Sequence, residues 1–299
     1  MNQTDLENYE KIRNGEIGYY RQNRGLIEVS GKEAVQFLNG LITNDVAKLE
    51  ENNAMLAAFP NAQGRTLAVV RVLKKDGKFL FETEKATHEK VYNNLFRFTF
   101  AGDFFVNDLS EKYSYFSMEK GKREIENDDF IGFQTRSGID LFVPHESVED
   151  FLKQLKKENA LEISGELYAV LRIENGIPLY GIDMNETTIV PELGIDGLIS
   201  YNKGCYIGQE IIARIYFRGH VAKQLRGLVF DAADSEIEPG EELKSTEGKS
   251  AGKITSVTFS PKLGKKIALA FVRYEFLTDE TELKAGDFTA KVRSLPFIN

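Results

Sequence analysis

The 299-residue sequence predicts an α+β protein with a discontinuous first domain, an inserted second domain and an all-β tail. Two separate stretches, 25–50 and 130–175, each combine strand patterns with an amphipathic helix. A β-rich stretch lies between them, and helical periodicity ends beyond residue 221. This order is typical of one domain interrupted by another. The expected domains are residues 1–48 together with 129–218, residues 49–128, and residues 219–299.

The first predicted elements are a strand from Gly25 to Ser30 and the helix after it. Ser30 is followed three residues later by Glu33, the spacing of a capping box at a helix start. Apolar residues then recur at helical spacing as far as Leu41, and Gly40 marks the expected end. A polar turn containing Asn44 should follow directly.

The middle of the chain predicts a hairpin and then a helix. Two strand patterns, Thr66 to Leu73 and Lys78 to Thr83, flank the turn pair Asp76-Gly77. Helical spacing then runs from Glu84 to Phe98. Short strands are expected within residues 101–120.

The next part of the chain returns to the discontinuous domain. The acidic stretch Glu124 to Asp129 predicts an exposed connection. A strand from Gly138 to Val143 precedes an amphipathic helix that contains Phe151. Ser164 is placed to cap one more helix, which should end near Gly176.

The tail after residue 221 predicts a small all-β domain, either a barrel or a sandwich. Glycine and proline separate its alternating runs, as turns require. The expected strands are Leu225 to Phe230, Ala251 to Phe259, Lys266 to Arg273 and Phe288 to Leu295.

The composition limits the compartment and the partners. With 42% hydrophobic and 28% charged residues the chain reads as a globular protein, and no apolar run approaches the ~20 residues of a membrane helix. The formal net charge of -8 argues against nucleic acid or membrane partners, although it leaves room for a local basic groove. One cysteine and three histidines lack the spacing of a zinc site, so we expect no metal. A single cysteine also fits the reducing cytoplasm.

The only cysteine, Cys205, stands between two glycines and close to Lys203, just before a run with helical character. A thiol near a helix N-terminus and a cation is biased toward its thiolate. The alternative is a buried packing cysteine, which would normally lie in an apolar run. We therefore favour a functional thiol at Cys205.

The same stretch carries a family resemblance. The sequence Lys203-Gly204-Cys205-Tyr206-Ile207-Gly208-Gln209-Glu210, extended through Ala213-Arg214 and Gly219, resembles the signature of the YgfZ-type folate-binding proteins. These are iron–sulfur maturation factors related to the T-protein (aminomethyltransferase) of glycine cleavage. Four other stretches resemble motifs shared with T-protein: residues 37–46, 61–65, 171–178 and 260–270.

The resemblance implies a three-domain ring: a discontinuous ferredoxin-like domain, an inserted α+β domain and a C-terminal antiparallel β-barrel. It implies tetrahydrofolate in a central channel and a role in assembling or repairing iron–sulfur proteins. The implied partners are folate and iron–sulfur client or assembly proteins. Two alternatives stay open, a folate-dependent aminomethyltransferase or demethylase and a non-catalytic scaffold of the same fold. Ala68 and Val69 argue against the transferase, because they stand where T-proteins place carboxylates.

The resemblance also implies folate-binding residues. Glu192 follows Pro191 at the spacing of the pterin-binding glutamate of T-proteins, with Glu186 as its nearby competitor. The alternative for Glu192 is a solvated acid in a loop. Tyr180 would stack on the pterin or simply pack against its own helix. Asn44 is expected near the channel.

Cations lie on both sides of Cys205. Lys203, Arg214 and Arg218 are candidates to hold the glutamate tail of folate. His220 is a candidate base for the thiol, but no orienting acid is evident in the sequence. Cys205 would act through thiol chemistry or through contact with a cluster or partner. Since iron–sulfur clusters normally use four protein ligands, one thiolate allows only a shared or transient contact.

Overall fold

The computed structural model describes residues 1–119, 127–232 and 236–298, so part of the predicted acidic connection, at Glu124, lies outside the described residues. The chain divides into two compact units. Unit 1 comprises residues 1–61, 67–167 and 197–207, and unit 2 comprises residues 62–66, 168–196 and 208–299.

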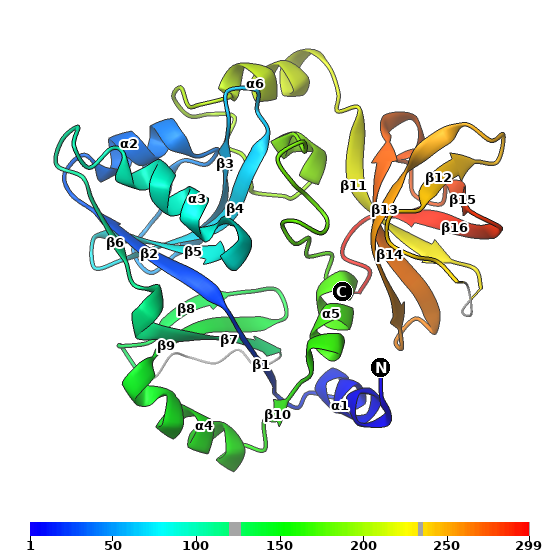
Figure 1. Ribbon diagram of the computed structural model, residues 1–299, viewed down its shortest axis with the longest axis horizontal. Helices are drawn as coiled ribbons and strands as arrows, with labels where there is room; N and C mark the ends of the chain where they lie inside the picture. Colours follow the sequence, from blue (N-terminus) through cyan, green and yellow to red (C-terminus); the bar gives the residue numbers. More distant parts are fainter. Residues whose placement is uncertain (120–126, 233–235, 299) are drawn as a thin grey trace. The chain divides into compact units, whose positions relative to one another are not determined.

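Unit 1 contains two five-stranded sheets (Figure 1). Sheet 1 has the order β3-β4-β5-β2-β6, and sheet 2 has the order β10-β1-β7-β9-β8. The strands of sheet 1 are β2 (Arg24–Ser30), β3 (Ala54–Pro60), β4 (Thr66–Lys75), β5 (Lys78–Glu84) and β6 (Phe105–Asp108). Those of sheet 2 are β1 (Gly18–Gln22), β7 (Tyr113–Glu119), β8 (Ile131–Gln134), β9 (Gly138–Pro144) and β10 (Leu161–Glu162). The helices are α1 (Gln3–Arg13), α2 (Ala34–Leu41), α3 (Lys85–Phe96) and α4 (Val148–Lys157).

The apolar side chains of unit 1 arrange these elements in four layers. Leu38 of α2 and Leu95 of α3 belong to one core with the first face of sheet 1. The other face of sheet 1 packs on sheet 2 through a second core that contains Leu80 and Phe142. Phe151 of α4 closes the far face of sheet 2. The order is therefore helices, sheet 1, sheet 2, helix.

A buried charge cluster joins the two sheets. The Arg71 guanidinium on β4 pairs with Glu82 of sheet 1 at 3.0 Å and with Asp140 of sheet 2 at 2.7 Å. It also donates to the Tyr115 hydroxyl of β7 at 2.7 Å, and Arg24 contacts the other Glu82 oxygen at 3.0 Å. Burial acts to raise the pKa of Glu82, but the two guanidiniums outweigh it and hold that pKa below its usual value.

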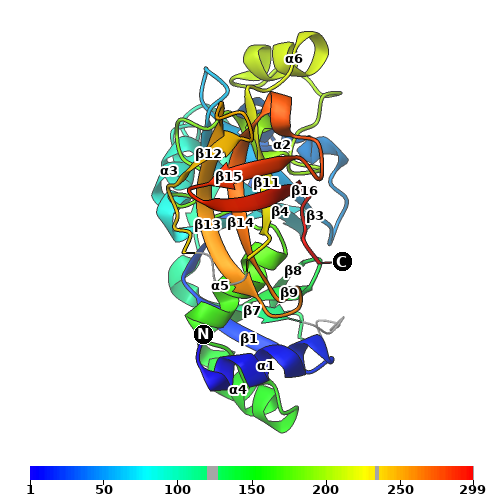
Figure 2. The same cartoon turned by 90° about the vertical axis from the view of Figure 1, so that its right-hand side faces the viewer.

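Unit 2 is built on a closed six-stranded antiparallel barrel with the order β11-β14-β13-β12-β15-β16 (Figure 2). Its strands are β11 (Lys223–Phe230), β12 (Glu242–Ser245), β13 (Ser250–Ser260), β14 (Lys265–Arg273), β15 (Glu282–Ala285) and β16 (Phe288–Arg293). Unit 2 also contains the α-helices α5 (Gly165–Glu174), which begins in unit 1, and α6 (Gln209–Arg218).

Most predicted elements are confirmed. The hairpin turn is present with positive φ at Asp76 (52°) and Gly77 (71°), and the Ser164 hydroxyl accepts from the Leu167 N–H at 3.1 Å. The α+β class and the C-terminal barrel are confirmed, with β12 and β15 as additional short strands. The division into three domains stays a prediction. The first predicted strand, β2, pairs with β5 and therefore belongs to sheet 1.

The predicted capping box is wrong. Ser30 is the last residue of β2 and pairs with Phe105, so it cannot begin a helix. α2 begins after Glu33, whose carboxylate accepts from the Asp103 N–H at 2.7 Å. A tertiary hydrogen bond therefore replaces the local one that the sequence predicts.

In the described parts of the chain, no helix is long and apolar enough to cross a membrane.

Replacing Arg71 by leucine should destabilise unit 1 by about 3–5 kcal/mol, because buried Asp140 would lose its cation and buried Glu82 would keep only Arg24. Lys153→Met, which breaks only exposed contacts with Glu149 and Asp150, should leave the urea midpoint nearly unchanged. Urea unfolding followed by circular dichroism measures both. Equal losses in the two variants would contradict a structural role for the cluster.

Candidate functional site

The cysteine segment, residues 197–207, lies in unit 1 against the α2 turn, residues 39–46. Four hydrogen bonds of 2.7–3.1 Å join the two. Their donors and acceptors are Asn44 Nδ2 to the Gly197 carbonyl, Thr43 Oγ1 to the Leu198 carbonyl, Ser200 N–H to the Thr43 carbonyl, and Ile207 N–H to the Gly40 carbonyl. The segment is thus fixed at both ends.

Lys203 adds a central contact. Its Nζ donates to the carbonyls of Ile42 at 2.9 Å and Asn44 at 2.5 Å, and reaches Asn39 Oδ1 at 3.5 Å. It also lies 5.1 Å from the centre of the Tyr206 ring. Burial lowers the pKa of Lys203 to about 8, while the charge of Asp45 acts in the opposite direction.

Two predicted folate contacts, Asn44 and Lys203, therefore meet in this turn. The Asn44 amide donates to the Leu56 carbonyl at 2.8 Å and to the Gly197 carbonyl at 2.7 Å. Both side chains hold protein groups here, and their roles toward folate stay predictions.

Cys205 is exposed, so it is not the buried packing cysteine of the alternative interpretation. Gly204 beside it is also exposed, and no atom would lie within 4 Å of an added Cβ there. Tyr206 is buried, and Ile207 packs against the core shared by sheet 1, α2 and α3. The thiol thus stands in open space between anchored neighbours.

Glu192 lies in unit 2, in the short 3-10 helix Val190–Leu193. It is buried, and its Oε2 accepts from the Ile189 N–H at 3.1 Å. Burial raises the pKa of the Glu192 carboxyl, although that hydrogen bond and the charges of Lys223 and Arg65 act to lower it. A carboxylate held in this way is ready to accept further N–H donors.

The turn at residues 62–66 supports the segment before Glu192. The Val190 N–H donates to the Gly64 carbonyl at 3.0 Å, and the Thr66 N–H donates to the Thr188 carbonyl at 2.8 Å. Gly64 has φ of +69°, and a Cβ there would lie 3.2 Å from the Ile212 side chain of α6. The positive φ therefore favours glycine, and a side chain there would also require Ile212 to shift by a few tenths of an ångström.

A buried ion pair fixes the same region to the barrel, and sequence reasoning missed it. Arg172 of α5 donates to Asp183 Oδ2 and to the Ser256 hydroxyl, both at 2.9 Å. The hydroxyls of Thr255 and Ser256 each donate to Asp183 Oδ1 at 2.6 Å. The available signal was the arginine between Leu171 and Ile173, within an apolar run.

The other predicted residues also lie in unit 2. Tyr180 is half-buried and bridges to Met184. Arg214 and Arg218 are exposed one turn apart on α6, where Arg214 pairs with Glu210 at 2.7 Å. His220 stacks on the Tyr274 ring, with 3.6 Å between ring centres.

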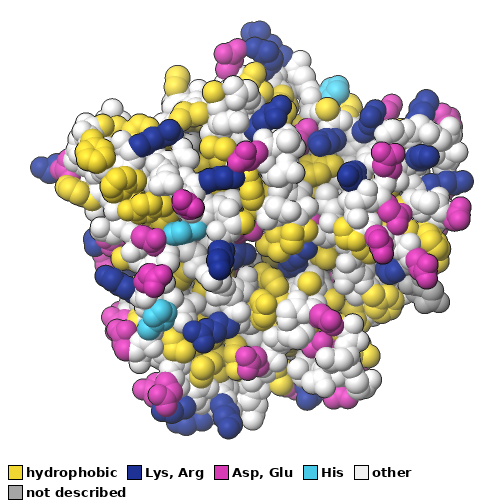
Figure 3. Space-filling model, viewed as in Figure 1, with side chains coloured by type: hydrophobic (Ala, Val, Ile, Leu, Met, Phe, Trp, Pro, Cys, Tyr) yellow, Lys and Arg dark blue, Asp and Glu magenta, His cyan; other side chains and the backbone are white. Residues whose placement is uncertain are grey.

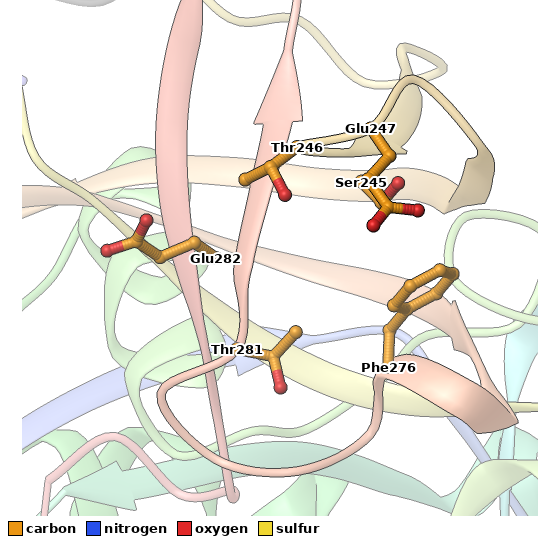
Figure 4. A pocket seen from close by; sticks show the side chains of 6 residues that line it. All are labelled: Ser245, Thr246, Glu247, Phe276, Thr281 and Glu282. Carbon is orange, nitrogen blue, oxygen red and sulfur yellow. The ribbon is translucent and has the colours of Figure 1, made fainter.

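Charges of both signs are interspersed over the face of the molecule in Figure 3. Hydroxyl side chains, two carboxylates and one aromatic ring line a pocket of about 340 Å³ at the barrel (Figure 4). None of the predicted site residues lines it. Its lining residues are Ser245, Thr246, Glu247, Phe276, Thr281 and Glu282.

Comparison with known families gives two matches. Residues 3–119 match the GCVT N-terminal domain, and residues 223–299 match the glycine cleavage T-protein C-terminal barrel domain. The second match coincides with the barrel of unit 2. The chain therefore belongs to the T-protein superfamily.

Relatives in this superfamily carry different names. An aminomethyltransferase of Thermoanaerobacter pseudethanolicus is 27% identical, over 93% of this chain and 84% of the relative. The tRNA-modifying protein YgfZ of Hamiltonella defensa is 31% identical, over 67% of this chain and 66% of the relative. A mitochondrial iron-sulfur cluster assembly factor IBA57 homolog of Mycosarcoma maydis is 25% identical, over 92% of this chain and 78% of the relative.

A solved structure shares the fold. The crystal structure of the glycine cleavage system aminomethyltransferase T from Bartonella henselae matches with a TM-score of 0.87. The match covers 98% of this chain and 89% of that chain, at 19% identity. The T-protein fold is therefore confirmed.

Glu192→Gln should raise the melting temperature of the ligand-free protein at pH 7. A carboxyl whose pKa is raised on folding binds its proton more tightly in the folded state, so stability falls as the pH rises from the unfolded value of about 4.3. Glutamine removes this cost and keeps an acceptor for the Ile189 N–H. The gain should therefore shrink at pH 4.

Thermal melts at both pH values test this, with the exposed Glu186→Gln as control. A lower melting temperature for Glu192→Gln at pH 7 would contradict the expectation.

Proposed function

We propose that this protein is a tetrahydrofolate-binding factor of the YgfZ type that supports the assembly or repair of iron–sulfur proteins. The observation that carries the proposal is the exposed Cys205 in a segment anchored on both sides. The sequence around it resembles the YgfZ-type signature. A cytoplasmic location is part of the proposal, since one cysteine suits a reducing compartment.

The second candidate is a folate-dependent aminomethyltransferase or demethylase. It is favoured by the relatives named aminomethyltransferase. Against it stands the strand after Gly64, where Ala68 is fully buried in the core beneath α2 and α3. Neither Ala68 nor Val69 can orient or deprotonate an amine. A non-catalytic scaffold is the third candidate.

Tetrahydrofolate fits one feature of unit 2 in particular. The Glu192 carboxylate is buried, keeps one hydrogen bond to the Ile189 N–H, and would accept the 2-amino and N3 protons of a pterin. Within the same unit, we assign Arg214 and Arg218 to the negative glutamate tail and Tyr180 to a further contact. When bound, the folate would supply a carrier for one-carbon units.

Cys205 is assigned a transient role toward a client or assembly protein. A stable cluster normally takes four protein ligands, and this chain offers one thiol. Thiol chemistry with a partner and brief contact during transfer both fit a thiol that is exposed and fixed in place.

Tetrahydrofolate should raise the melting temperature of the wild type, by mass action on the folded state. Glu192→Gln should weaken folate affinity by about tenfold or more, because charge-assisted hydrogen bonds to a ligand are worth ~1.5–3 kcal/mol. The same variant thus gains stability without folate and loses the response to it. The measurement is a melting series against folate concentration.

The exposed Glu186→Gln is the matched control and should respond like the wild type. An unchanged response in Glu192→Gln, or an equal loss in both variants, would show that another carboxylate binds the pterin.

In cells lacking their own YgfZ-type factor, the wild type should restore the activity of iron–sulfur enzymes, and Cys205→Ala should not. The alanine variant should keep its melting temperature and its folate response, because Cys205 is exposed and contributes little to packing. Full rescue by Cys205→Ala would favour the scaffold. Robust aminomethyl transfer by the wild type in a glycine-cleavage assay would favour the transferase.

A further inference from the structure

The ammonium of Lys203 is surrounded by oxygens of its own protein. A lysine ammonium has three N–H donors, and three oxygens of the α2 turn lie within 3.5 Å of Nζ. Two are backbone carbonyls that follow the end of α2, at Ile42 and Asn44, and the third belongs to the Asn39 side chain. No donor is left in this arrangement for a ligand.

We propose that Lys203 is a positioning residue that clamps the cysteine segment to the α2 turn and so fixes where Cys205 is displayed. The importance of this position rests on the proposed function of Cys205. The clamp itself rests only on contacts within unit 1.

The contacts explain why a lysine is needed. A helix C-terminus carries partial negative charge and unpaired carbonyls, which a cation satisfies. The compact ammonium directs its donors to three separate oxygens, whereas the planar guanidinium of arginine presents a rigid fork. The long apolar stem of Lys203 also brings the charge over the Tyr206 ring. Lysine therefore joins both sides of Cys205 to the same turn.

Lys203 lies between the other hydrogen bonds that join the segment to the α2 turn. Those bonds lie at Gly197, Leu198 and Ser200 before it and at Ile207 after it. Without Lys203, residues 201–206 would lose the three contacts of the ammonium with the α2 turn, and Cys205 lies among these residues. Loss of the clamp should therefore increase the motion of the thiol rather than unfold the unit.

The test uses the fact that Cys205 is the only cysteine. A nitroxide spin label attached to it reports motion on the nanosecond scale without further substitutions. The label should be restricted in the wild type and several-fold more mobile in Lys203→Met, which keeps the apolar stem and removes the donors. Lys203→Arg should give an intermediate spectrum, since it restores charge and donors in a different geometry.

Lys32→Met, at an exposed lysine of the same unit, is the control and should leave the spectrum unchanged. Lys203→Leu, which also lacks N–H donors, replaces the methionine variant if that variant does not fold by circular dichroism. Equal mobility in the wild type and in the folded Lys203 variant would overturn the proposal.

Two further measurements on unlabelled protein separate the roles. Lys203→Met should keep the folate-induced rise in melting temperature but restore iron–sulfur enzymes several-fold less well than the wild type. A lost folate response with an unchanged label spectrum would instead assign Lys203 to the glutamate tail and overturn the clamp. Full rescue by Cys205→Ala would refute the proposed function alone, because the label spectra do not depend on it.

Discussion

The ion pairs of the Arg71 guanidinium are the interaction on which unit 1 depends. It pairs with a carboxylate of each sheet, Glu82 and Asp140, and so holds two layers face to face. Apolar packing would bring the sheets together, but it does not fix how they slide past each other, whereas charged hydrogen bonds are directional. Helices α2 and α3 pack on the outer face of sheet 1. The α2 turn, which binds the cysteine segment, begins at the end of α2 in the chain.

Unit 2 uses a similar device for a different purpose. The Arg172–Asp183 pair joins α5 and the connection after it to barrel strand β13. That connection leads to Glu192, whose carboxylate is buried and accepts from the Ile189 N–H. Candidate chemistry in both units therefore lies on irregular segments that buried polar contacts hold to regular structure.

The sequence predicts what local periodicity and turn chemistry determine. The hairpin at Asp76-Gly77 and the long strands of the barrel follow from alternation and glycine alone. β12 and β15 escape prediction because four residues contain only one large apolar side chain each, Leu243 and Leu283. The Lys203 contacts could not be predicted either, because the accepting carbonyls lie about 160 residues earlier in the chain. Motif resemblance located Cys205, but only tertiary structure shows what holds it.

One exposed thiol in a chain without any other cysteine sets a stoichiometry. Oxidation of this protein alone cannot close a loop within the chain, and it cannot build polymers through disulfides. A disulfide can only pair two copies, and each pairing consumes both thiols at once. A mixed disulfide with another protein or with a small thiol likewise admits one adduct per molecule. Each molecule can therefore form only one disulfide with a partner at a time.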